Sequence, residues 1–265
     1  IELLLEALLA AINELLPELN ILLKNDGKMR AIEGLDEYVR VAQGDVPKLV
    51  PLKENGVSFL VPVWDGQKTG WFYDHRLNRR RVQKLSAGKR VLDIFSYIGG
   101  WGIQAAAAGA KEVVCVDASA SALDLVHQQA QLNGVADKVH SLKGDAFAAM
   151  KQLHEDGERF DMVIIDPPAF IARRKDIKAG ELAYQRANQL AMRLLTPEGI
   201  LVSASCSMHL ERTRLTQLLQ EACRKNGRNG QVLEQGGQGG DHPIHPAIPE
   251  TDYLKSVILR TWYED

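Results

Sequence analysis

The chain has 265 residues, of which 45% are hydrophobic and 25% are charged, a composition typical of a globular protein with a sizeable core. Its net charge of −2 excludes a protein that is basic throughout, so any nucleic-acid contact must rest on local patches. The cysteines at positions 115, 206 and 223 form no CxxC pair. This spacing argues against a metal site and favours a reducing, cytoplasmic compartment.

Residues 1–16 are predicted to form an amphipathic helix that ends before Pro17. Its apolar run is interrupted by glutamates and is too short to span a membrane. Because the first residue is Ile1 and not methionine, we expect a fragment or a processed chain. Residues 17–70 are predicted to be a small β-rich region, in which Asn55-Gly56 favours a type I′ hairpin turn. Residues 34–44 show no clear pattern.

The stretch RVLDIFSYIGGWG from Arg90 to Gly102 predicts a buried parallel strand, a glycine turn and a helix, the opening of a nucleotide-binding α/β unit. Asp93 lies at the strand end, where it would repel a pyrophosphate and attract the ammonium group of S-adenosylmethionine. Asp117 ends the next strand and is expected to accept hydrogen bonds from ribose hydroxyls. The alternative is a glycine-rich turn that binds no ligand.

Strands and helices alternate after this unit, with further strands expected at 139–142, 160–165 and 199–203. Asp145 follows the first of these and suits the exocyclic amine of an adenine. Residues 232–234 and 254–260 are expected to form a closing hairpin. In open α/β sheets the carboxyl ends of the strands bind ligands, which is where these acids fall.

Asp166-Pro167-Pro168 follows a predicted strand and forms a stiff loop, of the kind that holds the methylated base or amine in methyltransferases. The alternative is a rigid strand exit. Cys206 lies between two serines after the next strand. Alone it would be interpreted as structural, but beside this loop we interpret it as a nucleophile. A thiolate that adds to carbon 6 of cytosine activates carbon 5 for methylation, and Asp166 near N3 would stabilise the adduct.

Two basic clusters are candidates for RNA contact. Helical spacing from Asp74 carries Arg79, Arg80 and Arg81, which we expect either to face phosphates or to form a solvated surface. The second cluster directly follows the Asp-Pro-Pro loop and is a better candidate for phosphate binding than a random charged face; it consists of Arg173, Arg174 and Lys175.

Together these motifs resemble the bacterial large-subunit ribosomal RNA cytosine-5 methyltransferases of the methyltransferase I type. The resemblance covers about residues 50–260. The matching stretches are KTGWFYDHR from Lys68, VLDIFSYIGG from Val91, DPPAF from Asp166, SCS from Ser205, DHP from Asp241 and PETDYLK from Pro249.

The resemblance implies a Rossmann-like class I methyltransferase domain over 71–265, with a mostly parallel seven-stranded sheet, after a small β-rich domain over 17–70. Residues 1–16 would be a linker from a missing PUA domain. The implied partner is 23S rRNA, with no membrane and no indicated oligomeric state. The implied S-adenosyl-L-methionine site consists of Asp74, Arg76, Asp93, Ser96, Tyr97, Gly99, Asp117, Asp145 and Asp166.

The chain departs from the family pattern at two positions. His75 stands where glutamine is usual, which weakens any role for His75, and Ala169 stands where related enzymes carry a second cysteine for product release. Two alternative functions stay open: N-methylation of an RNA base, such as guanine N7, and a non-catalytic RNA-binding assembly factor. Loss of turnover in Cys206→Ala would exclude the former, and a failure to bind S-adenosylmethionine would favour the latter.

Overall fold

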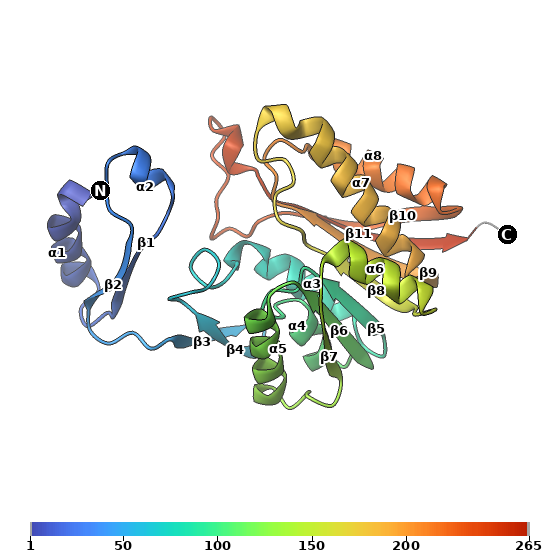
Figure 1. Ribbon diagram of the computed structural model, residues 1–265, viewed down its shortest axis with the longest axis horizontal. Helices are drawn as coiled ribbons and strands as arrows, with labels where there is room; N and C mark the ends of the chain where they lie inside the picture. Colours follow the sequence, from blue (N-terminus) through green and yellow to red (C-terminus); the bar gives the residue numbers. More distant parts are fainter. Residues whose placement is uncertain (1, 264–265) are drawn as a thin grey trace. The chain divides into compact units, whose positions relative to one another are not determined.

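The computed structural model of the protein describes residues 2–263 (Figure 1). The chain divides into two compact units. The first consists of Ile1–Leu52 and Leu60–Phe72, and the second of Lys53–Phe59 and Tyr73–Asp265. Within the described residues, no helix is both long and apolar enough to cross a lipid bilayer.

The first unit begins with a short 3-10 turn, η1 (Glu2–Leu4), and helix α1 (Leu5–Leu15), as the apolar pattern predicts; Ile1 lies outside the described residues. An antiparallel pair of strands follows, and its elements are β1 (Ile21–Asn25), α2 (Met29–Ile32) and β2 (Tyr38–Gln43). Strand β2 was missed because residues 34–44 showed no clear pattern, and the structure buries none of the strand's residues fully.

Strands β3 (Leu49–Glu54) and β4 (Val57–Pro62) form the predicted hairpin. At its turn, Asn55 has a φ of 51° and Gly56 a φ of 86°. A type I′ turn needs positive φ at both central residues, which Asn-Gly adopts at low cost. The predicted turn is therefore confirmed.

The second unit contains a seven-stranded sheet in the order β10-β11-β9-β8-β5-β6-β7. The five strands β9, β8, β5, β6 and β7 are parallel, whereas β11 and β10 are antiparallel. This arrangement confirms the predicted fold class. The strands are β5 (Arg90–Ile94), β6 (Glu112–Asp117), β7 (Val139–Lys143), β8 (Phe160–Ile165), β9 (Leu195–Ser205), β10 (Arg228–Gly236) and β11 (Lys255–Tyr263).

Helices cover both faces of this sheet. Leu92 and Ile94 belong to the core that α6, α7 and α8 complete. Asp93 points to the opposite face, where it binds the first residue of α4, because side chains alternate along a strand. The helical elements are η2 (Tyr73–His75), α3 (Arg76–Leu85), α4 (Gly102–Ala107), α5 (Ala120–Leu132), α6 (Ala146–Glu155), η3 (Arg174–Asp176), α7 (Ile177–Arg193), α8 (Arg212–Lys225) and η4 (Pro249–Thr251).

Candidate active site

Five of the predicted polar residues lie along one edge of the sheet. Cys206 follows β9, Asp166 follows β8, Asp93 lies near the end of β5, Asp117 ends β6 and Asp145 follows β7. These five strands are parallel and are consecutive neighbours in the sheet. Their carboxyl ends therefore form one continuous edge, at which open α/β sheets bind ligands.

The turn after β5 is backbone-strained. Phe95 has a φ of 64° and Tyr97 a φ of 49°, a left-handed conformation that is costly for residues with a Cβ, and Gly99 follows at 82°. Asp117 holds this turn. Its Oδ2 accepts a hydrogen bond from the Tyr97 backbone N–H at 2.8 Å, and its Oδ1 accepts one from Ser119 at 2.9 Å. Strain held by neighbouring contacts is characteristic of ligand-binding turns.

Asp93 is completely buried. Its Oδ2 accepts a 2.8 Å hydrogen bond from the Gly102 backbone N–H, whereas its Oδ1 has no hydrogen-bond partner among the described residues. Burial raises the pKa of Asp93 to about 8, and the bond from Gly102 offsets only part of this effect. A Cβ at Gly102 would lie 2.7 Å from the sulfur of Cys115, so only glycine permits this close approach. A buried carboxyl group with one unpartnered oxygen is suited to a cationic ligand.

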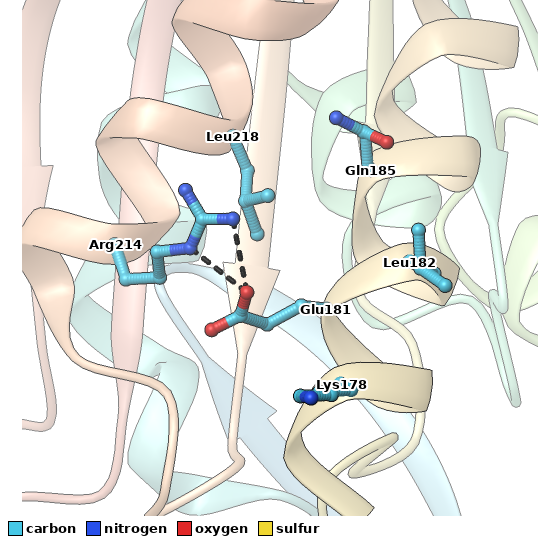
Figure 2. Close-up of a pocket in the computed structure, with 6 residues that line it drawn as sticks. All are labelled: Lys178, Glu181, Leu182, Gln185, Arg214 and Leu218. Carbon is cyan, nitrogen blue, oxygen red and sulfur yellow. Dashed lines mark hydrogen bonds and ion pairs between the residues drawn. The ribbon is translucent and has the colours of Figure 1, made fainter.

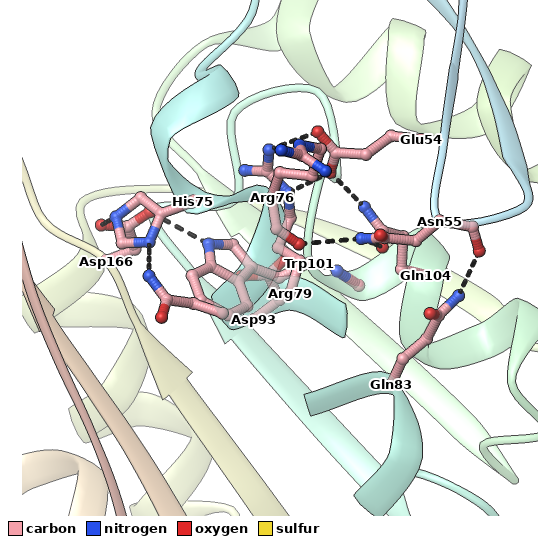
Figure 3. A network of polar contacts seen from close by, with 12 residues as sticks. Glu54, Asn55, His75, Arg76, Arg79, Gln83, Asp93, Trp101, Gln104 and Asp166 are labelled. Carbon is pink, nitrogen blue, oxygen red and sulfur yellow. Dashed lines mark hydrogen bonds and ion pairs between the residues drawn. The ribbon is translucent and has the colours of Figure 1, made fainter. Parts of the chain in front are cut away.

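Asp166 is held by two side chains (Figure 3). His75 Nε2 lies 3.3 Å from Oδ1, and the indole N–H of Trp101 donates to Oδ2 at 3.0 Å. The Asn78 amide nitrogen lies 3.1 Å from His75 Nδ1 and also donates to the Gly237 carbonyl at 3.0 Å. Because a carbonyl only accepts, Gly237 fixes the orientation of the amide, so Nδ1 is the acceptor in this contact. The proton of a neutral His75 is therefore on Nε2, facing Asp166.

These partners set the charge of Asp166. Burial alone would raise its pKa, but His75, Trp101 and Arg79 outweigh burial, and the net shift is downward. Asp166 is therefore a carboxylate at neutral pH. Sequence reasoning discounted His75, and the only available signal was its place within the conspicuous Asp-His-Arg triplet.

Cys206 is presented by a rigid, buried segment. Every residue from 200 to 207 is buried except Cys206, which is half-buried. The hydroxyl of Ser205 donates to the Tyr184 hydroxyl at 2.9 Å and accepts from the Ser207 backbone N–H at 3.1 Å. Ser207 Oγ lies 2.8 Å from the Tyr184 hydroxyl and accepts from the Ile171 backbone N–H at 3.1 Å. The two serines thus fix the cysteine between them and tie its loop to the one that follows Asp166.

Lys255, which bonds to this loop from another strand, is a residue that sequence reasoning missed. It is the first residue of β11, is 3% exposed, and donates from Nζ to the Ser207 carbonyl at 2.7 Å. Burial lowers the pKa of Lys255 to about 8. The signal that could have found it is its place as the last residue of the PETDYLK stretch.

Other predicted cofactor residues have structural partners at this edge. The Tyr253 hydroxyl donates to Asp74 Oδ2 at 2.8 Å, and Arg76 Nη2 lies 3.4 Å from a carboxylate oxygen of Asp241. Ser96 is buried. Asp145 is exposed and caps α6, since its Oδ1 accepts the Ala148 backbone N–H at 2.9 Å. Their contact with a cofactor stays a prediction.

The expectation that Arg79 faces RNA phosphates is wrong. Its side chain is 3% exposed and forms a bidentate ion pair with Glu54 through bonds of 2.6 and 2.9 Å (Figure 3). Gln104 donates to the same carboxylate at 2.8 Å. The Arg79 guanidinium is therefore part of a buried polar cluster and does not face solvent. Arg80 is exposed, as are Arg173, Arg174 and Lys175, and Arg173 also binds Asp176 at 2.9 Å.

A pocket on the outer side of α7 and α8 contains none of the predicted residues (Figure 2). The Arg214 guanidinium and the Glu181 carboxylate lie 2.9 Å apart at its wall. Its lining residues are Lys178, Glu181, Leu182, Gln185, Arg214 and Leu218. The candidate site is therefore the sheet edge and not this pocket.

A family model matches the part of the chain that carries these residues. Residues 36–243 match the model of the S-adenosylmethionine-dependent methyltransferases. The chain belongs to this family. The predicted cofactor is thereby confirmed, and the unpartnered Oδ1 of Asp93 fits the cationic end of that molecule.

The methyltransferase also has curated relatives. It is 40% identical over 257 residues to "Ribosomal RNA large subunit methyltransferase I" of Aeromonas salmonicida, covering 96% of this chain and 65% of the relative. A protein of the same name from Erwinia tasmaniensis is 36% identical over 256 residues, with 96% and 65% covered. These relatives confirm the resemblance seen in the motifs. The methyltransferase chain spans slightly less than two thirds of their length.

Solved structures share the fold. Trm5b from Pyrococcus abyssi superposes with a TM-score of 0.68 at 18% identity, covering 96% of this chain and 68% of that protein. A SAM-dependent methyltransferase from Agrobacterium tumefaciens gives a TM-score of 0.63 at 21% identity, covering 86% and 74%. At these identities the likeness shows a shared architecture.

Proposed function

We propose that the protein transfers a methyl group from S-adenosylmethionine to carbon 5 of a cytosine in large-subunit (23S) ribosomal RNA, through a covalent bond to Cys206. The names of the curated relatives support the RNA class. One observation carries the chemistry: Cys206 is the single residue of the segment 200–207 that is not buried. It also leaves the sheet beside Asp166, because β9 and β8 are parallel neighbours.

The reaction explains why a thiol is needed. Carbon 5 of cytosine is a poor nucleophile. When the Cys206 thiolate bonds to carbon 6, the electron pair of the 5,6 double bond becomes available at carbon 5. Bound S-adenosylmethionine supplies an electrophilic methyl group on its sulfonium. Loss of the carbon 5 proton to a base then expels the thiolate and restores the ring, whereas methylation of an amine needs no such step.

Asp166 orients the base in this scheme. As a carboxylate it accepts hydrogen bonds, so it would hold the exocyclic amine of cytosine and stabilise a proton at N3 of the covalent adduct. The target nucleotide must be unpaired or flipped out, because carbon 6 is not accessible within a stacked duplex. The exposed cluster Arg173, Arg174 and Lys175 follows the Asp166 loop and would bind the flanking phosphates.

The order of the acids supports the orientation of the cofactor. Asp93 lies near the end of β5, Asp117 ends β6 and Asp145 follows β7. These are successive strands of the sheet, about 5 Å apart. S-adenosylmethionine has an amino-acid end, a ribose and an adenine in the same succession. With its ammonium at Asp93, its ribose at Asp117 and its adenine at Asp145, the reactive methyl group would face β8 and β9, where Asp166 and Cys206 lie.

The test is methyl transfer to unmodified large-subunit rRNA by the full-length protein with labelled S-adenosylmethionine, followed by nucleoside analysis. We expect label in 5-methylcytosine that disappears in Cys206→Ala. The matched control is Cys223→Ala, which removes a buried thiol from α8 and should retain activity. Label in N7-methylguanosine, or label that survives Cys206→Ala, would reject the cysteine mechanism. A protein that binds no S-adenosylmethionine in calorimetry would instead be an assembly factor.

A further inference from the structure

We propose that Lys255 is a positioning residue whose ammonium group stabilises the thiolate of Cys206 and fixes the loop that carries it. This inference deepens the proposed function, since it rests on Cys206 as the nucleophile. Lys255 acts through Cys206 and is not assigned any contact with the RNA or the cofactor.

The pairing of β11 with β9 places Lys255 beside the segment that carries Cys206. In the antiparallel register, Lys255 lies opposite Ser205, the residue that precedes Cys206. The Lys255 side chain also contacts Ser207, the residue that follows Cys206, because Nζ donates to the Ser207 carbonyl at 2.7 Å. A positive charge is thus anchored at the carbonyl of Ser207, one residue after the thiol.

The burial of Lys255 indicates that its ammonium group has a compensating negative charge nearby. Lysine is rarely buried unless its charge is compensated, yet Lys255 is only 3% exposed. Within residues 2–263, no carboxylate lies within salt-bridge distance of Nζ, and its one hydrogen bond is to a neutral carbonyl. A thiolate at position 206 would supply the missing negative charge.

The other groups around this pair do not replace Lys255. Tyr184 from α7 and Tyr253 from the preceding loop also interact electrostatically with Cys206. Burial is the main cause that raises the pKa of each, so both are neutral phenols at pH 7. Asp252 favours the charged form of Lys255 and Arg212 on α8 disfavours it, so these two groups act in opposite directions.

The proton balance of the activation step is simple. The thiol of Cys206 gives its proton to solvent, and Lys255 keeps its own. With a pKa of about 8, the lysine is mainly protonated at pH 7 and can act as the counter-charge. No electron transfer and no additional reactant are involved.

Alkylation of Cys206 in the full chain tests this proposal without RNA or cofactor. The rate of reaction with iodoacetamide is measured against pH by peptide mass spectrometry, and the buried Cys115 and Cys223 serve as internal references. In the wild type we expect the rate to rise with a midpoint below the ordinary thiol pKa of about 8.5. Lys255→Met should move the midpoint up by about one unit, which slows alkylation about 10-fold at pH 7. Lys255→Arg keeps the charge and should retain most of the wild-type profile.

A wild-type midpoint at or above about 8.5 would overturn the proposal, even if Lys255→Met does not fold. So would a folded Lys255→Met protein, verified by thermal melting, with an unchanged alkylation profile. The assay separates this proposal from the proposed function. If the alkylation midpoints behave as expected but no 5-methylcytosine forms, the proposed reaction is rejected and the role of Lys255 is not. If 5-methylcytosine forms and depends on Cys206, but Cys206 is alkylated with the pH dependence of an ordinary thiol, only the role of Lys255 is rejected.

Discussion

The Nε2 atom of His75 lies 3.3 Å from Oδ1 of Asp166, in ion-pair contact with the carboxylate. Trp101 donates to the other oxygen of the same carboxylate at 3.0 Å. Trp101 thus donates to one oxygen and His75 lies in ion-pair contact with the other, and together they lower the pKa of Asp166 against the effect of burial. The carboxylate therefore has a fixed direction and a fixed charge before any base arrives.

We expect His75→Ala to raise the pKa of Asp166 and to shift the acidic limb of the pH profile for methyl transfer upward. The stabilisation of an ionised carboxylate is present above the unfolded pKa and is lost as the pH falls, so removing a donor narrows the active range from the acidic side. A charge-assisted contact of this kind is worth about 1.5–3 kcal/mol, which corresponds to an upward shift of about 1–2 pH units in the acidic limb.

The conservative variant His75→Gln is the control for this prediction, because its amide offers an N–H to Asp166. Its acidic limb should lie near that of the wild type. If His75→Ala retained the wild-type limb while losing activity uniformly at all pH values, His75 would be shaping the substrate site and not the charge of Asp166.

Asp93→Asn is expected to abolish S-adenosylmethionine binding and yet to stabilise the fold. Burial raises the pKa of Asp93 to about 8, so the folded state holds a proton that the unfolded state releases above about pH 4. Ionisation of Asp93 therefore lowers the free energy of unfolding progressively as the pH rises from about 4 to 8. Asparagine does not ionise, so the variant does not lose stability in this way. Thermal melting at pH 5 and pH 8.5 should show an advantage of the variant that grows with pH.

The gain in melting temperature of Asp93→Asn over the wild type is the quantity that tests this prediction. A gain of about 1 kcal/mol corresponds to a rise of about 2–4 °C in melting temperature for a chain of this size. A variant that is less stable than the wild type at pH 8.5 would contradict the raised pKa. Calorimetric titration of the same samples measures S-adenosylmethionine binding, and undiminished affinity in Asp93→Asn would contradict the assignment of Asp93 to the ammonium group.

The buried pair of Arg79 and Glu54 should dominate the stability contributed by α3. Removing one partner leaves an uncompensated buried charge, so Arg79→Met should cost about 3–5 kcal/mol in urea unfolding. The matched control is Arg81→Met, because Arg81 binds Glu234 at 2.9 Å on the surface and is 54% exposed. That change should cost less than about 1 kcal/mol. Equal costs for the two variants would contradict the buried pairing.

The line of polar residues at the sheet edge could be predicted because each has a local signature. A buried apolar run followed by an acid or a cysteine marks a strand end, and parallel strands end at the same edge. Asp93, Asp117, Asp145, Asp166 and Cys206 were all found in this way. The backbone geometry, and not any detail of side-chain packing, brings them together.

The partners of these residues could not be predicted, since they come from distant segments. His75 lies 91 positions before Asp166 and touches it only because α3 begins over the end of β8. Lys255 reaches the Cys206 loop because β11 pairs with β9. No local sequence pattern predicts this pairing. Arg79 looked like a surface charge because the sequence does not show which face of α3 meets Glu54.

The strand order β9-β8-β5-β6-β7 reverses direction at β5: the chain runs outward through β6 and β7, then crosses over to β8 and β9. In the proposed reaction, the ends of β5, β6 and β7 bind the methyl donor, and the ends of β8 and β9 bind the base. The two sides meet at Asp166, since Trp101 from the turn after β5 donates to its carboxylate. A redesign of the target atom would therefore have to keep this contact for the supply of methyl groups to stay intact.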